Sequence, residues 1–343
     1  MGKRIRKGVI VPLVFMPYST KIEDFDSLAL PWEQLLKQSS RNHIFLTPTW
    51  QRLWWNRFGE GKELLLVSVR SHRELVGIAP LMRDDSRLSL VGDSDVCDYL
   101  DLVAMKGHEE GVCLTLHSVL EELEWCRLDL TPLRPDSVIA RHLIPLLTDK
   151  GYTVDATQID TSPETPLPEQ WEEFLAGLSK KDRHELRRKL RRLERAGEVQ
   201  HRCCKDPGTL PQDLEDFFRL FKESRAEKSG FLTPERKAFF QEMARSMMQR
   251  DYLRLSFLEL NGERVSTNLC FEYDDSVYLY NSGYDPRYSR LAVGLLLKAH
   301  CLRKAIEAGK KRFDFLRGAE PYKYDLGGKD VPIYRFEVKR QTT

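Results

Sequence analysis

The chain has 343 residues, of which 41% are hydrophobic and 31% charged, so it is long enough for two domains that each bury a core. Lys and Arg total 54 against 52 Asp and Glu, which gives a net charge of +2. This near-balance excludes a chain-wide field that would favour nucleic acid, and any recognition by charge must be local.

The first predicted element is a strand at 9–16, which follows a short basic segment and contains Pro12. Basic residues before an apolar run imitate a signal peptide, but this run is short and has no clear cleavage site. No stretch approaches the ~20 apolar residues of a membrane span. We therefore predict a cytoplasmic protein with no membrane span.

The elements of the first half begin with helical segments over 31–58, interrupted by a turn at 47–49 where Thr47 or Thr49 caps the second helix. A hairpin, further strands and two helices follow as far as 156. The predicted elements are strands at 63–70, 75–82, 89–92 and 100–103, a helix at 109–123, a strand at 127–130, a helix at 136–150 and a strand at 152–156.

A Pro-, Thr- and Glu-rich connector at 161–168 leads into the second half. There Asn261-Gly262 between two apolar runs is the strongest short signal for a hairpin. The predicted elements are helices at 171–196, 211–228 and 234–250, strands at 253–260, 265–273 and 277–281, a helix at 293–308, and strands at 312–316 and 333–339.

The two halves share one order of elements: helices, a hairpin, another strand, a helix and a strand. This order predicts a duplicated α/β (α+β) fold with mixed, largely antiparallel sheets flanked by helices. We place the boundary between residues 165 and 166, with a basic helix at 179–196 opening the second domain.

The seven cysteines are odd in number and irregularly spaced, which argues against a disulfide framework, and we expect reduced thiols. The eight histidines show no ligand spacing, so we predict no metal site.

The most informative segment runs from a strand at 278–285 through Leu291–Gly294 into a long apolar helix. A helix that begins directly after a strand directs unpaired N–H groups at a ligand above the sheet, and such groups bind anions. The alternative is an ordinary solvent-facing turn before a buried helix. A polar loop ending at Lys323 follows the next strand and would flank the anion site.

These residues resemble the GNAT-type acyltransferases of the CelD/BcsL (cellulose-biosynthesis acetyltransferase) family, which are related to the Fem peptidyltransferases. The resemblance spans roughly 40–340, and one departure is Ala292-Val293-Gly294 where the family often has Ser-Pro-Gly. The matching segments are 47–50, 54–55, 77–81, 91–92, 98–101, 178–183, 281–285, 291–294, 314–318 and 322–323.

The resemblance implies two fused GNAT-like units and an acetyl-CoA or other acyl-CoA donor. The pyrophosphate of the donor would lie on the N–H groups at the start of the helix, with arginines adding charge. The residues expected to bind the donor are Asn281, Tyr284, Arg287, Arg290, Leu291, Ala292, Val293, Gly294 and Arg317.

Acyl transfer needs a base for the acceptor proton and donors for the oxyanion. The candidates are carboxylates, a tyrosine that returns a proton to the thiolate and a lysine that stabilises negative charge; each could instead form structural ion pairs. The expected catalytic residues are Asp98, Asp314, Glu320, Tyr322 and Lys323.

An acceptor cleft between the two halves would involve Trp54, Tyr99 and Asp101, although Asp101 could equally cap a helix and Trp54 could belong to the core. The basic helix aligns Arg187 and Arg191 on one face, where they would grip an anion. Its simpler interpretation is a solvated helix resting on a leucine stripe.

The predicted function is therefore an N- or O-acyltransferase that acts on a small-molecule or carbohydrate acceptor, such as a polysaccharide precursor. The alternatives are a Fem-like peptidyltransferase that uses aminoacyl-tRNA and a catalytically inactive binding module. The sequence does not predict the oligomeric state.

Overall fold

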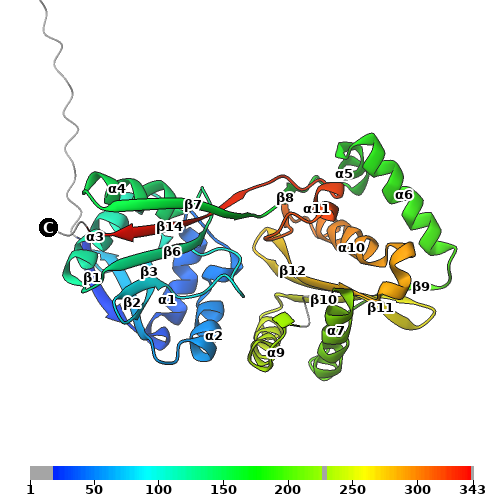
Figure 1. The fold of residues 1–343 in the computed structure, drawn as a ribbon, viewed down its shortest axis with the longest axis horizontal. Helices are drawn as coiled ribbons and strands as arrows, with labels where there is room; N and C mark the ends of the chain where they lie inside the picture. The colour runs from blue at the N-terminus through cyan, green and yellow to red at the C-terminus, as the bar shows by residue number, and fades with distance from the viewer. Residues whose placement is uncertain (1–17, 226–229, 341–343) are drawn as a thin grey trace, which may run out of the picture.

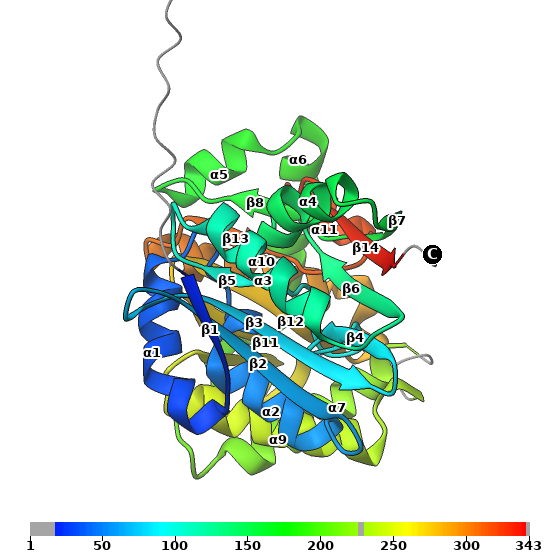
Figure 2. The same ribbon diagram turned by 90° about the vertical axis from the view of Figure 1, so that its left-hand side faces the viewer.

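The computed structural model describes residues 18–225 and 230–340, and the strand predicted at 9–16 lies outside them. The described chain forms two units side by side, each built on one sheet (Figure 1). Helices cover both faces of each sheet, as the amphipathic patterns predict. In Figure 2, α3 and α4 lie on one side of the first sheet and α2 on the other.

The first sheet has eight strands in the order β1-β2-β3-β4-β6-β14-β7, with β5 paired to β3. The strands are β1 (Tyr18–Glu23), β2 (Glu63–Ser71), β3 (Glu74–Asp84), β4 (Arg87–Leu90), β5 (Val103–Ala104), β6 (Arg127–Leu133), β7 (Thr153–Thr161) and β14 (Pro332–Lys339). The helices are α1 (Phe25–Gln38), η1 (Ile44–Leu46), α2 (Pro48–Phe58), α3 (Glu109–Glu122), the π-helical turn η2 (Ile139–Leu143) and α4 (Ile144–Asp149).

The second sheet has six strands in the order β8-β13-β12-β11-β10-β9. They are β8 (Glu164–Pro166), β9 (Val199–Cys203), β10 (Leu253–Leu260), β11 (Glu263–Tyr273), β12 (Ser276–Tyr284) and β13 (Arg312–Asp314). The helices are α5 (Trp171–Gly177), α6 (Lys180–Glu194), α7 (Leu210–Ser224), α9 (Pro234–Gln249), η3 (Pro286–Leu291), α10 (Val293–Glu307) and α11 (Pro321–Asp325).

The predicted duplication is visible in the topology. Each sheet is antiparallel except for a parallel pair joined by a helix: β4 and β6 through α3, and β12 and β13 through α10. A parallel pair requires such a crossover helix. The predicted class, two GNAT-like units with mixed and largely antiparallel sheets, is confirmed.

The two units exchange strands at the point where we placed the boundary. After β7 the chain passes to β8, which pairs with β13 of the second sheet. The last strand, β14, returns to lie between β6 and β7, and Figure 1 shows it in red among the strands of the first sheet. The described parts of the two segments, 18–165 and 166–340 without 226–229, are therefore interleaved, and residues 332–339 complete the first sheet.

Several predicted elements differ from the structure, and two of them differ for a clear physical reason. The helix expected over 171–196 is broken, because Leu178 is extended and the Ser179 side chain accepts from Asp182 N and caps α6. The strand expected at 100–103 is reduced to β5, because residues 91–102 leave the sheet between β4 and β5 and reach the second unit. Thr47, one of the two predicted caps, begins α2.

The largest hydrophobic cluster runs through both units. Trp50 and Phe45 of the first unit pack edge-on against Phe271 and Tyr278 of the second, with ring centroids 5.4 and 6.3 Å apart. The Tyr280 hydroxyl donates to Val96 O at 2.9 Å. A shared apolar core of this kind holds the two sheets in one fixed arrangement.

Candidate active site

The opening at the candidate site arises where two parallel strands separate. β12 and β13 pair from Ser276 and Arg312 as far as Tyr278 and Asp314, and β12 then continues to residue 284 paired only with β11. A bulge against β11 leaves Tyr280 as an extra residue on β12. Bulges turn a strand away from its neighbour, and ligands bind beyond the carboxyl ends of such strands.

A short turn carries the chain from β12 into α10. Asp285 begins η3 by accepting from Arg287 N at 2.9 Å. Ala292 then has φ 57°, a left-handed conformation that costs on the order of 1 kcal/mol for a residue with a side chain. No side chain of the described residues caps α10, and its first turn holds no acidic residue. Its first N–H groups therefore remain able to bind an anion.

A pocket of about 250 Å³ lies against this helix start. Its walls come from the ends of α7 and β12, from α10 and from α11. The lining residues are Ser224, Arg225, Ser282, Tyr284, Ser289, Ala292, Val293, Gly294, Leu295, Lys298, Glu320 and Tyr322.

Gly294 and Lys298 define the inner wall of the pocket. A Cβ on Gly294 would lie 3.1 Å from Tyr284 Cδ1, so the glycine leaves the space that a ligand would use. Lys298 is 5% exposed, donates to Gly294 O at 3.2 Å and lies 4.6 Å from the centre of the Tyr322 ring. A buried ammonium one turn into the helix adds positive charge to the N-terminal dipole.

Glu320 and Tyr322 form the opposite wall and differ in protonation. Burial opposes ionisation of Glu320, but the adjacent Lys323 ammonium holds the pKa of Glu320 below its ordinary value. Burial raises the pKa of Tyr322, as does the nearby Glu320 carboxylate. Near neutral pH the pocket therefore holds a carboxylate that can accept a proton and a phenol that can donate one.

The structure brings together six of the residues predicted from sequence: Tyr284, Ala292, Val293, Gly294, Glu320 and Tyr322 all line the pocket. Leu291 is half-buried beside it, and Arg290 is exposed on η3. Arg287 is also exposed, but its guanidinium pairs with Asp285 and Glu263 at 2.6 Å each. These two carboxylates already neutralise the charge of Arg287, so the expected contact between Arg287 and a phosphate is not supported.

Two further expectations need correction. Asn281 precedes the pocket-lining Ser282 on β12 and is not itself in the lining. Lys323 is 1% exposed, and its ammonium donates to the carbonyls of Leu316, Arg317 and Gly318 at 2.7, 2.6 and 2.9 Å. With Glu320 Oε2 at 3.0 Å as well, this lysine ties down the loop instead of stabilising charge on a substrate.

Replacement of Lys323 by Met is expected to loosen the loop before α11. Buried carbonyls without donors cost about 1–3 kcal/mol each, so we expect K323M to lose about 3 kcal/mol of unfolding free energy. Hydrogen exchange at residues 316–320 should rise, whereas K329M, at an exposed position on the adjoining loop, should leave it unchanged. Unaltered exchange in K323M together with lost turnover would restore the catalytic role.

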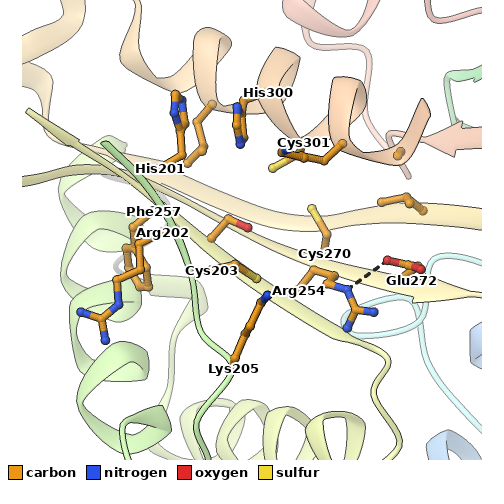
Figure 3. Close-up of a pocket in the computed structure, with 15 residues that line it drawn as sticks. His201, Arg202, Cys203, Lys205, Arg254, Phe257, Cys270, Glu272, His300 and Cys301 are labelled. Carbon is orange, nitrogen blue, oxygen red and sulfur yellow. Dashed lines mark hydrogen bonds and ion pairs between the residues drawn. The ribbon is translucent and has the colours of Figure 1, made fainter. Parts of the chain in front are cut away.

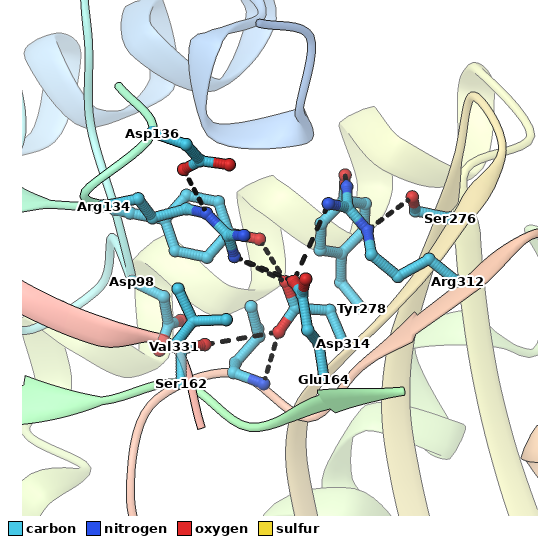
Figure 4. A network of polar contacts seen from close by, with 12 residues as sticks. Asp98, Arg134, Asp136, Ser162, Glu164, Ser276, Tyr278, Arg312, Asp314 and Val331 are labelled. Carbon is cyan, nitrogen blue, oxygen red and sulfur yellow. Dashed lines mark hydrogen bonds and ion pairs between the residues drawn. The ribbon is translucent and has the colours of Figure 1, made fainter. Parts of the chain in front are cut away.

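Asp314 belongs to a buried network between the units (Figure 4). It is 0% exposed and accepts from Tyr99 Oη at 2.5 Å and from Leu316 N at 2.9 Å, with Arg134 Nη1 at 3.8 Å. Burial raises its pKa. Ser162 Oγ donates at 3.3 Å to Asp314 Oδ1, the oxygen that also accepts from Leu316 N. Asp314 is fully buried and lines neither the pocket at α10 nor the one beside Trp54, so the expectation that it is the general base is not supported.

The other residues predicted around an acceptor cleft also have structural partners. Asp98 accepts from Arg317 N and Nε at 3.0 and 3.3 Å, so the predicted acid and the predicted donor-binding cation neutralise each other. Asp101 is 1% exposed and accepts from the backbone of Leu102, Val138 and Ile139, which makes it the cap of η2. Burial raises the pKa of Asp101 to about 7.

Tyr99 and Trp54 differ in their access to a pocket. Tyr99 is 1% exposed under the Arg134 guanidinium and is no part of an open cleft. Trp54 is 2% exposed, donates to Asp93 Oδ2 at 3.0 Å and lies at the edge of a pocket of about 510 Å³. That pocket joins residues of the first unit to Glu235 of α9.

The basic helix α6 packs its leucines on the second core and leaves its cations in solvent. Arg187 is exposed and pairs with Glu172 at 3.2 Å, and Arg191 is exposed. The helix contacts α10 and η3, so it lies beside the turn of the candidate site.

Ser224, Arg225, Ser282, Ser289 and Lys298 were missed from sequence. Lys298 left a usable signal, since a charged residue four positions after Gly294 interrupts an apolar helix. Arg225 left none, because only the fold brings the end of α7 to the start of α10.

The first unit lacks a matching anion site at its equivalent helix. α3 begins with Glu109 and Glu110, and its cap position is His108, which makes no side-chain cap. Acidic side chains at a helix N-terminus repel an anion where α10 would attract one. Of the two crossover helices, only α10 is suited to a phosphate-bearing ligand.

These features place an open helix N-terminus and a pocket with a carboxylate and a phenol in the second unit. Residues 180–324, which include all of α10 and α11, match the family described as acetyltransferase (GNAT) domain. GNAT domains take acyl groups from acyl-CoA. The chain is thus an acyltransferase that carries a GNAT domain in its second half.

Solved structures resemble nearly the whole chain. FemX is 12% identical, with a TM-score of 0.64 over 93% of this chain and 96% of that one. The C-terminal domain of a putative lysylphosphatidylglycerol synthetase from Agrobacterium fabrum is 10% identical, with a TM-score of 0.59 over 93% of each chain. A tandem GNAT protein from the clavulanic acid pathway is 12% identical, with a TM-score of 0.53 over 95% and 99%. At these identities the likeness establishes the fold.

None of the curated proteins matches the chain at a significant level of sequence similarity. Over 18–225 and 230–340, no three His, Cys, Asp or Glu side chains gather as metal ligands would. No helix in the same residues is long and apolar enough to cross a membrane.

Proposed function

We propose that the protein is an acyl-CoA-dependent N- or O-acyltransferase, with acetyl-CoA as the first donor to test. The observation that carries the proposal is the uncapped start of α10, with buried Lys298 behind it and the separation of β12 from β13 beside it. The donor pyrophosphate fits the N–H groups of this turn, and Arg225 and Lys298 supply the counter-charge.

The transfer step follows from the opposite wall of the pocket. The acceptor amine or hydroxyl attacks the thioester carbonyl, its proton passes to Glu320, and the carbon–sulfur bond breaks. The leaving thiolate takes a proton from Tyr322, whose raised pKa keeps it protonated until then. This assignment retains Glu320 and Tyr322 from the sequence prediction and omits Asp98, Asp314 and Lys323.

The Lys298→Met variant tests the donor site, because Met fills a similar volume without the charge. One charge-assisted contact is worth about 1.5 kcal/mol, so we expect the Kd for acetyl-CoA to rise about tenfold in calorimetry. The control is Arg303→Met on the exposed side of the same helix, which should bind as the native protein does. Equal affinity in both variants would remove Lys298 from the donor site.

The acceptor is proposed to be an amine or hydroxyl compound of the sugar or polysaccharide-precursor kind that the CelD/BcsL resemblance implies. The pocket beside Trp54 supports this, because polar side chains, among them Asp84 and Ser89, line it and can hydrogen-bond a polyhydroxylated ligand. Incubation with acetyl-CoA and a panel of amino sugars, sugars and amino acids, followed by mass spectrometry, would identify the acylated product.

A second candidate is an aminoacyl-tRNA-dependent transferase, which the exposed cations of α6, a helix that contacts η3, favour. Phosphate contacts release counterions, so RNA binding would weaken steeply with salt, and Arg187→Ala with Arg191→Ala would flatten that dependence. Tight acetyl-CoA binding and salt-insensitive, weak tRNA binding would exclude this candidate.

A further inference from the structure

A cavity of about 430 Å³ lies between α10 and strands β9, β10 and β11 and plays no part in the proposed transfer (Figure 3). Three of the seven cysteines line it: Cys203 from β9, Cys270 from β11 and Cys301 from α10. All seven are free thiols. Segments far apart in sequence thus bring three thiols to one cavity, although the cysteines show no pattern along the chain.

Cys301 and Cys270 line the same cavity, and their pKa values are shifted in opposite directions. The contact between the two thiols is the main cause that raises the pKa of Cys270 and lowers that of Cys301. The fully buried Asn268 donates from Nδ2 to Cys301 Sγ at 3.4 Å. This hydrogen bond and the nearby Lys298 charge both lower the pKa of Cys301. A donated hydrogen bond and a nearby cation both favour a thiolate, so Cys301 is the nucleophile of the pair.

Access to the two sulfurs differs as well. Cys301 is partly exposed at the cavity wall, whereas Cys270 is 1% exposed beneath it. The lining also holds the four cations Arg202, Lys205, Arg254 and Lys304 against one carboxylate, Glu272, which pairs with Arg254 at 3.0 Å, so its net charge is positive. A small neutral oxidant can therefore reach Cys301 first, with Cys270 positioned to react second.

We propose that Cys301 and Cys270 form a peroxide-sensitive pair. The Cys301 thiolate attacks one oxygen of hydrogen peroxide, the O–O bond breaks, and a sulfenic acid and hydroxide result. The Cys270 sulfur then attacks the Cys301 sulfur, a disulfide forms, and the sulfenic oxygen leaves as water with the Cys270 proton. Peroxide is reduced, and the two thiols are oxidised.

The disulfide would tie α10 to β11 seven residues, or two helical turns, beyond Gly294. The cross-link lies on the donor-binding helix but outside the donor pocket, because neither cysteine lines that pocket. The thiol chemistry is independent of the proposed function and stands or falls on its own measurement.

The test is a time course of the native full chain with hydrogen peroxide, alkylation of the remaining thiols after denaturation, and mass mapping of the peptides. We expect a reductant-sensitive Cys270–Cys301 peptide to be the first disulfide to appear. Cys126 is exposed and serves as the internal control, and its oxidation should be about tenfold slower, because the Asn268 hydrogen bond and the Lys298 charge favour a thiolate at Cys301.

Two variants sharpen the assignment. In C270S the sulfenic acid has no partner, so Cys301 should accumulate a dimedone adduct, and in C301S no linkage should form at Cys270. If Cys126 oxidised first, or if Cys301 linked to Cys203 instead, the proposed pair would be wrong. These outcomes can be read in the native protein even if a variant folds poorly.

Discussion

Gly294→Leu should weaken acetyl-CoA binding by at least ~100-fold, or about 2.7 kcal/mol, without unfolding the protein. The first atom of the new side chain would already lie 3.1 Å from Tyr284 Cδ1, and the remaining atoms would fill a pocket of about 250 Å³. The backbone itself tolerates leucine, because Gly294 has no positive φ. Calorimetry with acetyl-CoA measures the loss.

The matched control for this substitution is Gly177→Leu at the end of α5. An added Cβ there meets no atom within 4 Å. G177L should bind acetyl-CoA as the native protein does, and the melting temperatures of both variants should confirm that they fold. Native-like affinity in G294L would place the donor elsewhere.

Asp314→Ala should destabilise the fold strongly. The substitution leaves Tyr99, Leu316 N and Ser162 without their acceptor and removes a negative charge beside Arg134, which is 4% exposed. Loss of one partner from a buried charged network costs about 3–5 kcal/mol. The midpoint of urea unfolding should fall accordingly, whether or not a donor is present.

Asp325→Ala is the control for that measurement, since Asp325 is exposed at the end of α11. A surface substitution of this kind changes stability by no more than about 0.5 kcal/mol. The competing interpretation is that Asp314 is the general base. It would gain support if D314A kept native stability and lost only turnover.

Local signals were sufficient for most elements of the fold. Asn261-Gly262 turns the β10–β11 hairpin, Thr47 caps α2, and the strand–turn–helix order around Gly294 marks the pocket. Each depends on residues close in sequence, where backbone preference and capping decide the conformation.

Long-range pairing could not be predicted in the same way. The insertion of β14 between β6 and β7 pairs residues about 170 to 210 positions apart in the sequence. The alternation of apolar and polar residues along one strand does not reveal which strands pair with it. Burial decided the roles of Asp314, Asp101 and Lys323. In sequence each is a polar residue in or beside a loop. Only the packed fold shows that each side chain is buried and already hydrogen-bonded within the protein.

The most direct test of the account is the stoichiometry of acetyl-CoA binding to the native protein by calorimetry. The start of α10 is uncapped, whereas α3 begins with Glu109 and Glu110, so one donor should bind per chain. A single site that G294L abolishes is the predicted result. Two sites per chain, or none, would contradict the assignment of one donor site to the second unit.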